Sequence, residues 1–334
     1  MRVITRVVLA GTMAVGVATV TLTAQGLLPG ERATAIAAIP GVIAADAKWE
    51  LVWADFETAD GIVGMPDGGV MFAQEQTDTI RKLDAASKES VFLSDTKGAG
   101  AVSVDTQGRV YAVQRTCTDS LRLGAKCQEP TRVAQVAPEQ RVLADKFSDG
   151  KPLGRVNDLI ADGKGGAYFT VSGGAYYVNA GGTMSIVENQ NLQSNGIMLS
   201  GDGKTLYVTN SVDVQAFDVR ADGTTTNRRL FGTLNGDKGG DGMAIDAAGR
   251  LYVTASTGVH VLSPEGKHLG VIPTPRPPIT VAFSGPDKKT LYVPQMGVVG
   301  PDGKPWTAPG LARNVAMTIY RIPMLAEGYK GRPK

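Results

Sequence analysis

The sequence predicts an all-β fold, a six-bladed β-propeller. One strand-turn-strand unit recurs six times in 334 residues, and successive copies begin 41, 56, 38, 46 and 39 residues apart. The 42 glycines show no collagen-like period and indicate many tight turns between short strands. No segment keeps an apolar period of 3.6 residues, so few helices are expected. A period near forty residues is typical of four-stranded propeller blades. A β-sandwich is the alternative, but that fold does not require the same unit to be repeated six times.

Each copy of the unit is a short apolar strand, a turn and a second strand. The clearest copy spans residues 241–254, DGMAIDAAGRLYVT, in which Gly and Asp supply the turn and β-branched and aromatic residues supply the strands. In chain order the copies span residues 60–73, 101–113, 157–170, 195–209, 241–254 and 280–293.

The two ends of such a ring have to meet, because an open first or last blade leaves unpaired strand edges. Residues 49–53, WELVW, and residues 315–322, VAMTIYRI, both have the composition of strands. We therefore expect them to lie in the same closing blade.

The N-terminus differs in composition from the rest of the chain. Arg2 and Arg6 precede an apolar run from Val7 to about Leu22, which is the pattern of a secretory signal peptide. We expect residues 1–45 to be a signal peptide and a flexible segment, and residues 46–334 to be the propeller. The protein would then be periplasmic or secreted, a monomer with no membrane contact after cleavage; a retained membrane anchor is the alternative.

Cys117 and Cys127 are the only cysteines, and they lie ten residues apart in a polar stretch, CTDSLRLGAKC. In an exported protein this spacing favours a disulfide that closes a loop. A two-ligand zinc fragment or a redox pair are the alternatives.

Composition limits the possible partners and chemistries. The net charge of +2 gives no electrostatic basis for nucleic-acid binding and fits a small ligand. His260 and His268 are the only histidines and flank a predicted turn, where we expect them to be exposed, which argues against a Ser-His-Asp triad. A G-x-S-x-G elbow, a P-loop and a dinucleotide fingerprint are all absent from the sequence.

Four oxygen-bearing residues stand at the beginning of a unit. The first strand of each propeller blade lines the central channel, so residues just before these strands gather at one mouth. These residues are Asp60, Asn157, Asn195 and Asp241. Two carboxylates and two amide oxygens suit a hard divalent cation. Each dipeptide alone is also an ordinary turn or cap, but the shared position favours a metal site in the channel.

Three stretches resemble a known family: GRVNDLIADGKGGAYFT, NGIMLSGDGKTLYVTNS and DGMAIDAAGRLYVTASTGVHVLSPEGKHLGVI. They are similar to motifs of the regucalcin/gluconolactonase family, also called senescence-marker-protein and luciferin-regenerating-enzyme-like proteins. The resemblance implies a six-bladed propeller, a divalent metal in its channel and hydrolysis of sugar lactones. It also implies that Asn195 and Asp241 are metal ligands, that Asn157 lies beside the metal and that Arg155 binds substrate.

The first motif departs from the family pattern. Where the family usually has Glu-Gly-Pro, this chain has Asp60-Gly61-Ile62. Aspartate is one methylene shorter than the family's glutamate, so either the metal shifts toward Asp60 or a water fills the gap between them. Glu57 is a weaker candidate to replace that glutamate as ligand.

The predicted function is metal-dependent hydrolysis of a lactone in the channel. Asp241 is the expected catalytic base and a metal ligand as well, and Arg155 could instead form an inter-blade salt bridge. Calcium is the first choice of metal, with magnesium, manganese or zinc as alternatives. A non-catalytic binding propeller and a lyase are the alternative functions.

Overall fold

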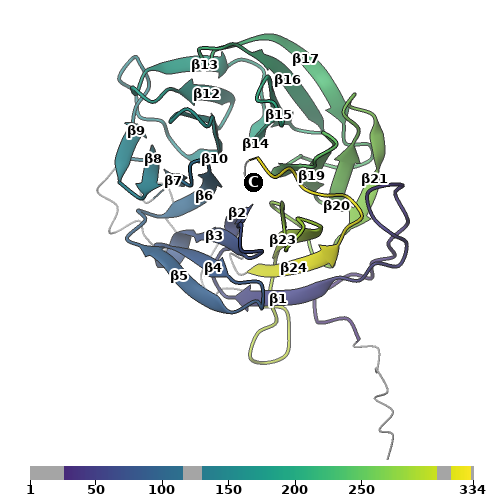
Figure 1. Cartoon of the computed structure of the whole chain (residues 1–334). Coiled ribbons are helices and arrows are strands. Elements are labelled where there is room, and N and C mark those ends of the chain that lie inside the picture. Colours follow the sequence, from purple (N-terminus) through teal and green to yellow (C-terminus); the bar gives the residue numbers. More distant parts are fainter. Residues whose placement is uncertain (1–25, 116–129, 307–316, 332–334) are drawn as a thin grey trace, which may run out of the picture.

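The computed structural model describes residues 26–115, 130–306 and 317–331. In this part of the chain six four-stranded antiparallel sheets are arranged as blades around a central channel (Figure 1). The one helix in the described ranges is a 3₁₀ turn, η1 (Glu75–Thr77). The predicted six-bladed β-propeller is therefore confirmed.

The blades follow one another in sequence, and each runs from an inner strand at the channel to an outer strand. Blade one contains β2 (Asp60–Gly64), β3 (Val70–Gln74), β4 (Thr79–Leu83) and β5 (Glu89–Ser94). Blade two contains β6 (Ala99–Val104), β7 (Val110–Gln114), β8 (Arg132–Ala137) and β9 (Arg141–Ala144). Blade three contains β10 (Val156–Ala161), β11 (Ala167–Val171), β12 (Gly174–Val178) and β13 (Met184–Glu188).

The second half of the ring repeats this order. Blade four contains β14 (Ser194–Leu199), β15 (Thr205–Asn210), β16 (Asp213–Val219) and β17 (Thr225–Thr233). Blade five contains β18 (Met243–Ile245), β19 (Leu251–Ala255), β20 (Gly258–Leu262) and β21 (His268–Pro273). Blade six contains β22 (Ala282–Ser284), β23 (Thr290–Met296), β24 (Met317–Pro323) and, on its outer edge, β1 (Glu50–Asp55).

The six repeated units are the first two strands of the six blades. Each inner strand contacts the inner strands of both neighbouring blades, so the ring is continuous around the channel. β6 and β7 are buried along their whole length, whereas β5 and β17 on the outside are mostly exposed. The core therefore lies between the blades and around the inner strands.

A turn built on one aspartate explains why the unit is so regular. Asp246 Oδ1 accepts hydrogen bonds from the backbone of Arg250 at 2.9 Å, and its Oδ2 accepts from Arg250 Nε at 2.6 Å and from the Tyr252 hydroxyl at 2.9 Å. Gly249 adopts the left-handed conformation that the turn requires, with φ of 82°. Asp105 makes the same set of contacts in blade two.

The ring closes as predicted. β1 pairs antiparallel with β24, with Glu50 opposite Arg321. Arg321 Nε and Nη2 each donate to the Glu50 carboxylate at 2.8 Å, a two-pronged contact across the closing pair. Strands from the two ends of the propeller thus share one sheet, which leaves no open blade.

The described part of the N-terminal segment, residues 26–45, packs against the propeller. Val42 and Ile43 are fully buried in a cluster with strands of blades five and six. Arg32 Nε donates to the carbonyl of Thr274 at 2.7 Å, and the Tyr320 hydroxyl bonds to Glu31. The apolar residues of this segment cover the outer side of these blades, so the packed domain begins well before residue 46.

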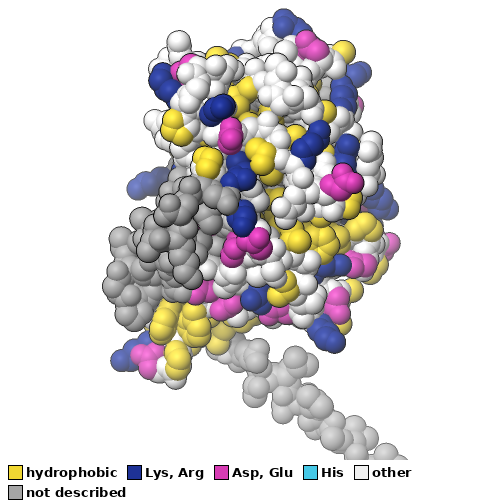
Figure 2. Space-filling model, turned by 90° about the vertical axis from the view of Figure 1, so that its left-hand side faces the viewer, with side chains coloured by type: hydrophobic (Ala, Val, Ile, Leu, Met, Phe, Trp, Pro, Cys, Tyr) yellow, Lys and Arg dark blue, Asp and Glu magenta, His cyan; other side chains and the backbone are white. Residues whose placement is uncertain are grey.

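Some predictions concern residues outside the described ranges. The basic and apolar parts of the predicted signal peptide lie in residues 1–25, and the predicted disulfide between Cys117 and Cys127 also lies outside the described ranges, so both stay predictions. No helix in the described part of the chain is both long and apolar enough to cross a membrane. On the flank shown in Figure 2, charged side chains of both signs are interspersed, consistent with the small net charge of +2.

The prediction that both histidines are exposed is wrong for His260. This ring is fully buried in blade five, where its Nε2 lies 3.0 Å from Asp237 Oδ2 and its Nδ1 lies 2.9 Å from His268 Nε2. The sequence places His260 beside a turn, but it lies on β20, an interior strand of the blade. Burial and the neighbouring His260 lower the pKa of His268.

Asp237 anchors this cluster, and its loss should destabilise blade five. Burial acts to raise its pKa, but hydrogen bonds from Ser256, Thr257 and His260 outweigh burial and hold the pKa well below its usual value. Replacing Asp237 with Asn is expected to lower the free energy of unfolding by about 1–3 kcal/mol, because the donors lose a charged acceptor. Urea titration at pH 7 measures this change, with the exposed Asp302→Asn as the control.

The Asp237 carboxylate also makes the free energy of unfolding depend on pH in a defined direction. Its folded pKa is depressed, so its contribution is complete above the unfolded-state pKa of about 3.9 and is lost as pH falls toward the folded pKa. The free energy of unfolding of the wild type should therefore decrease as the pH is lowered below about 4. Asp237→Asn should lack the part of this decrease that comes from protonation of Asp237. Equal stability of the variant and the wild type at pH 7 would contradict the assignment.

Candidate functional site

The predicted channel residues line one cavity at the mouth where the inner strands begin. Asp60 is the first residue of β2, and Asn157 and Asn195 are the second residues of β10 and β14. Asp241 lies two residues before β18. All four line a cavity of about 320 Å³, together with Arg155. The structure thus brings the predicted site residues together, although their individual roles remain predictions.

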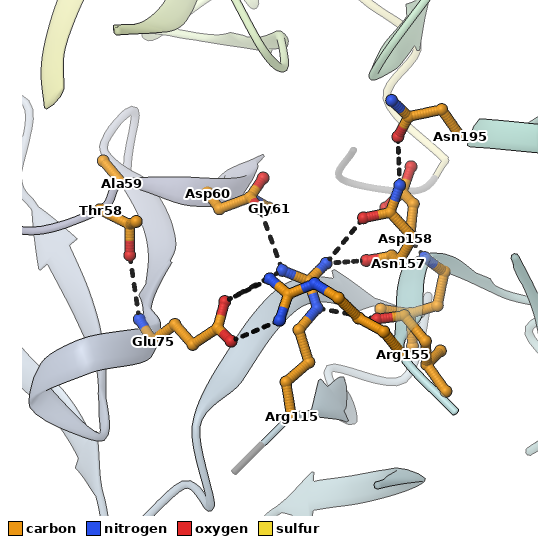
Figure 3. Close-up of polar contacts among 12 residues, drawn as sticks. Thr58, Ala59, Asp60, Gly61, Glu75, Arg115, Arg155, Asn157, Asp158 and Asn195 are labelled. Atoms are coloured by element: carbon orange, nitrogen blue, oxygen red, sulfur yellow. Dashed lines mark hydrogen bonds and ion pairs between the residues drawn. The ribbon is translucent and has the colours of Figure 1, made fainter. Parts of the chain in front are cut away.

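A buried arginine that the sequence analysis missed lies at the centre of this site (Figure 3). Arg115 directly follows β7 and is 2% exposed. Its Nε donates to the Val156 carbonyl at 2.8 Å, and its Nη1 donates to Asp60 at 3.3 Å and to Glu75 at 3.2 Å. Its Nη2 donates to the Asn157 side chain at 3.2 Å and to the Asn157 carbonyl. Every N–H group of the guanidinium therefore has an acceptor.

Gly100 makes room for this guanidinium. A Cβ at position 100 would lie 2.2 Å from Arg115 Cζ, far inside van der Waals contact. A glycine on β6 therefore lets the arginine lie across the inner strand. Three of its five N–H groups donate to Asp60 and Asn157, two of the predicted metal ligands, and so orient them.

Glu75 is the second residue that the sequence analysis missed. It is 2% exposed, follows β3 and contacts two guanidiniums. Arg155 Nη1 and Nη2 donate to its Oε1 and Oε2 at 3.1 Å each, and Arg115 Nη1 also donates to Oε2. The inter-blade salt bridge foreseen as an alternative role for Arg155 is therefore present, and its side chain is still 33% exposed.

A sequence signal for both residues exists. Glu75 ends VMFAQE in the first unit and Arg115 ends VYAVQR in the second, so they occupy the same position after the second strand. Met296 ends LYVPQM at that position in the sixth unit. These three residues all line the cavity. In units one, two and six the residue at the end of the second strand therefore faces the mouth.

Burial makes the carboxylates of Asp241 and Asp60 costly to ionise. Removal from bulk water, followed by the nearby charges of Asp60 and Asp158, raises the pKa of Asp241 well above its usual value. Burial also raises the pKa of Asp60, although Arg115 opposes it. A bound cation would relieve both effects, because it favours the ionised carboxylates.

The donor set fits a divalent cation. Four carboxyl groups line the cavity, those of Asp60, Glu75, Asp158 and Asp241, against the two guanidiniums of Arg115 and Arg155. When all four are ionised they leave an excess of two negative charges. Within the described ranges no group of three His, Cys, Asp or Glu side chains could hold a metal by itself. A cation in this channel therefore needs the amide oxygens of Asn157 and Asn195. The two side chains lie in contact, because Asn157 Nδ2 donates to Asn195 Oδ1.

The structure also specifies the environment of Asp60, where the sequence departs from the family pattern. Its Oδ2 faces Arg115 at 3.3 Å, and its Oδ1 accepts from the Gly61 backbone at 2.8 Å. Gly61 has no room for a side chain, since a Cβ would lie 2.3 Å from the Ala101 Cα. Glu57, the weaker substitute, is not among the residues that line the cavity.

Fold and site together define a class of protein: a six-bladed propeller whose channel mouth encloses carboxylate and amide oxygens. Residues 58–296 match the family described as the SMP-30/Gluconolactonase/LRE-like region. This chain belongs to that family, and the resemblance seen in the three sequence motifs is confirmed.

Individual members of the family are distant relatives. A gluconolactonase from Zymomonas mobilis is 22% identical over 287 residues, which cover 73% of this chain and 78% of the relative. A regucalcin from Xenopus laevis is 29% identical over 248 residues, 68% of this chain and 79% of the relative. The solved structure of a gluconolactonase from Xanthomonas campestris superposes with a TM-score of 0.65 at 20% identity, covering 91% of this chain and 99% of that one. At this identity the structural likeness shows the fold.

Proposed function

We propose that this protein is a hydrolase that opens lactones in the propeller channel with the help of one divalent cation. The observation that carries the proposal is the cavity itself, in which Asp60, Asn157, Asn195 and Asp241 present oxygens at one mouth. Membership of a family with a relative named gluconolactonase supports the choice of a lactone as substrate.

Asp60, Asn157, Asn195 and Asp241 would hold the cation, and calcium is our first choice because all four donors are oxygens. When bound, the cation would withdraw electrons from the lactone carbonyl and make its carbon a better electrophile. Arg115 donates to the side chains of Asp60 and Asn157 and so orients these two residues at the mouth.

Asp241 supplies the base in this proposal. A water attacks the lactone carbonyl carbon, and Asp241 takes the proton that the water loses. The ring C–O bond then breaks, the leaving oxygen regains a proton, and the product is a hydroxy acid. Arg155 keeps 33% of its side chain exposed, and we place it where its planar guanidinium meets a substrate oxygen.

A lactone panel with controlled metal content tests this function. We expect the metal-free protein, prepared with EDTA, to have lost hydrolysis of γ-butyrolactone, γ-nonalactone and D-glucono-1,5-lactone. Calcium, magnesium, manganese or zinc should restore hydrolysis of at least one of them. Carboxylate release measures the rate, and calorimetry measures cation binding independently.

The same experiment separates the alternatives. Stoichiometric cation binding with no hydrolysis of any lactone would contradict the enzyme and favour a binding propeller. An unsaturated product without oxygen from labelled water would indicate a lyase.

A further inference from the structure

The cavity has two chemically different walls. Blades one to three contribute charged and amide side chains, including Glu75, Arg155 and Asn157. Blade six contributes Met296 from β23 and Met317 from β24, which lie opposite each other in the strand register. Ile279, just before β22, completes this apolar wall.

Contacts with neighbouring backbone and side-chain groups hold two residues of the apolar wall, Met317 and Ile279. The backbone amide of Ala59 contacts Met317 Sδ at 3.2 Å. The Ile279 carbonyl accepts from the Gly242 backbone at 2.9 Å and from the Thr254 hydroxyl at 2.9 Å. Because Gly242 follows Asp241, the apolar wall begins directly beside the proposed base. Ile279 and Met296 are only half-buried, so part of each side chain faces the cavity.

Apolar surface is also exposed on the loop between β1 and β2. Phe56, between β1 and β2, is 37% exposed, and its ring packs against that of Trp306 with centroids 4.6 Å apart. The loop that carries Phe56 continues to Thr58, which lines the cavity. An apolar ring pair therefore lies close in the chain to Thr58, a residue of the cavity lining.

A polyhydroxylated ring fits this wall poorly. Hydroxyls on the blade-six side would give up hydrogen bonds to water and meet thioether and alkyl groups. Among the described lining residues Thr280 and Thr58 carry hydroxyls, and that of Thr58 already bonds to Gln76 and to the Glu75 backbone. An alkyl chain in the same place would bury apolar surface. Each methylene removed from water would raise the affinity about fourfold. The cavity of about 320 Å³ equals roughly ten waters at about 30 Å³ each, which leaves space for a ring and a short chain.

We propose that the substrate is a lactone that carries an alkyl side chain. The ester lies between Asp241 and the polar wall, and the chain lies along Ile279, Met296 and Met317. This inference rests on the proposed lactonase function and makes it more specific.

The test is the dependence of kcat/KM on chain length in the full-length, cation-loaded protein. We expect kcat/KM to rise about fourfold per methylene over the first two or three added to γ-butyrolactone, so that γ-nonalactone is at least about tenfold better. It should also exceed D-glucono-1,5-lactone. A flat alkyl series with D-glucono-1,5-lactone at least as good as γ-nonalactone would overturn the alkyl proposal and leave the lactonase intact. Hydrolysis of none of these lactones would overturn the lactonase proposal and this one with it.

Variants of the wall provide a second measurement. Met296→Gln and Ile279→Thr should each lower the ratio of kcat/KM for γ-nonalactone to that for γ-butyrolactone by about five- to tenfold, because they make the wall polar. Met65→Gln is the matched control, since Met65 is half-buried like Met296 but lies in the turn after β2 and outside the cavity. An unchanged ratio in both folded wall variants would contradict the placement of the chain.

Discussion

Replacing Asp241 with Asn is expected to reduce kcat for lactone hydrolysis by about 10³-fold or more. Asparagine has the same shape but cannot take a proton from water, and it removes one of the negative charges that would hold the cation. The variant should still fold, because in the wild type this carboxylate stands near Asp60 and Asp158 in a buried place. Initial rates at saturating lactone and calcium measure the effect.

The effect of Asp241→Asn on cation binding can be measured independently of the reaction rate. The melting temperature of the wild type should rise when calcium is added, and that of Asp241→Asn should rise much less. The matched control is Asp222→Asn, at an exposed turn of blade four. A wild-type rate in the folded Asp241→Asn protein would remove Asp241 from the mechanism.

Replacing Arg115 with Met is expected to destabilise the protein by about 3–5 kcal/mol. The side-chain volume is largely kept, but the Glu75 and Asp60 carboxylates and the Asn157 carbonyl lose a buried charged donor. Denaturant titration at pH 7 measures the loss in free energy of unfolding. Arg115→Lys should recover only part of it, because an ammonium group cannot reach five acceptor directions at once.

The control for Arg115 is an arginine in a surface ion pair. Arg81 contacts Glu89, and the two side chains are 23% and 35% exposed. Arg81→Met should cost about 0–1 kcal/mol. Similar losses for the two methionine variants would show that the Arg115 network contributes little to folding.

Much of the architecture can be read from the sequence because it is encoded locally. The turn at Asp246 and the same turn at Asp105 require a short stretch of sequence with aspartate, glycine, arginine and tyrosine in order. Copies of that stretch near a forty-residue period predict the blades, and equivalent positions in the copies predict which oxygens meet at the channel.

Other features depend on pairs that are distant in the chain. Arg115 and Glu75 are 40 residues apart, and Arg155 and Glu75 are 80 residues apart. Repeat symmetry shows that such positions face one mouth, but different residue types occupy them in different blades. Whether the residues at these positions form ion pairs or an apolar wall of the cavity depends on how those particular side chains pack.

The sequence by itself determined the six blades, the closing strand pair and the meeting of Asp60, Asn157, Asn195 and Asp241, because periodic turns and strands specify them. Only the tertiary structure decided that Arg115 holds two of these residues, that His260 is buried, and that residues 26–45 pack on blades five and six. It also decided that Met296 and Met317 form one wall of the cavity. The physical reason is that these features arise where blades or chain ends meet, and burial and close contact there depend on several segments at once.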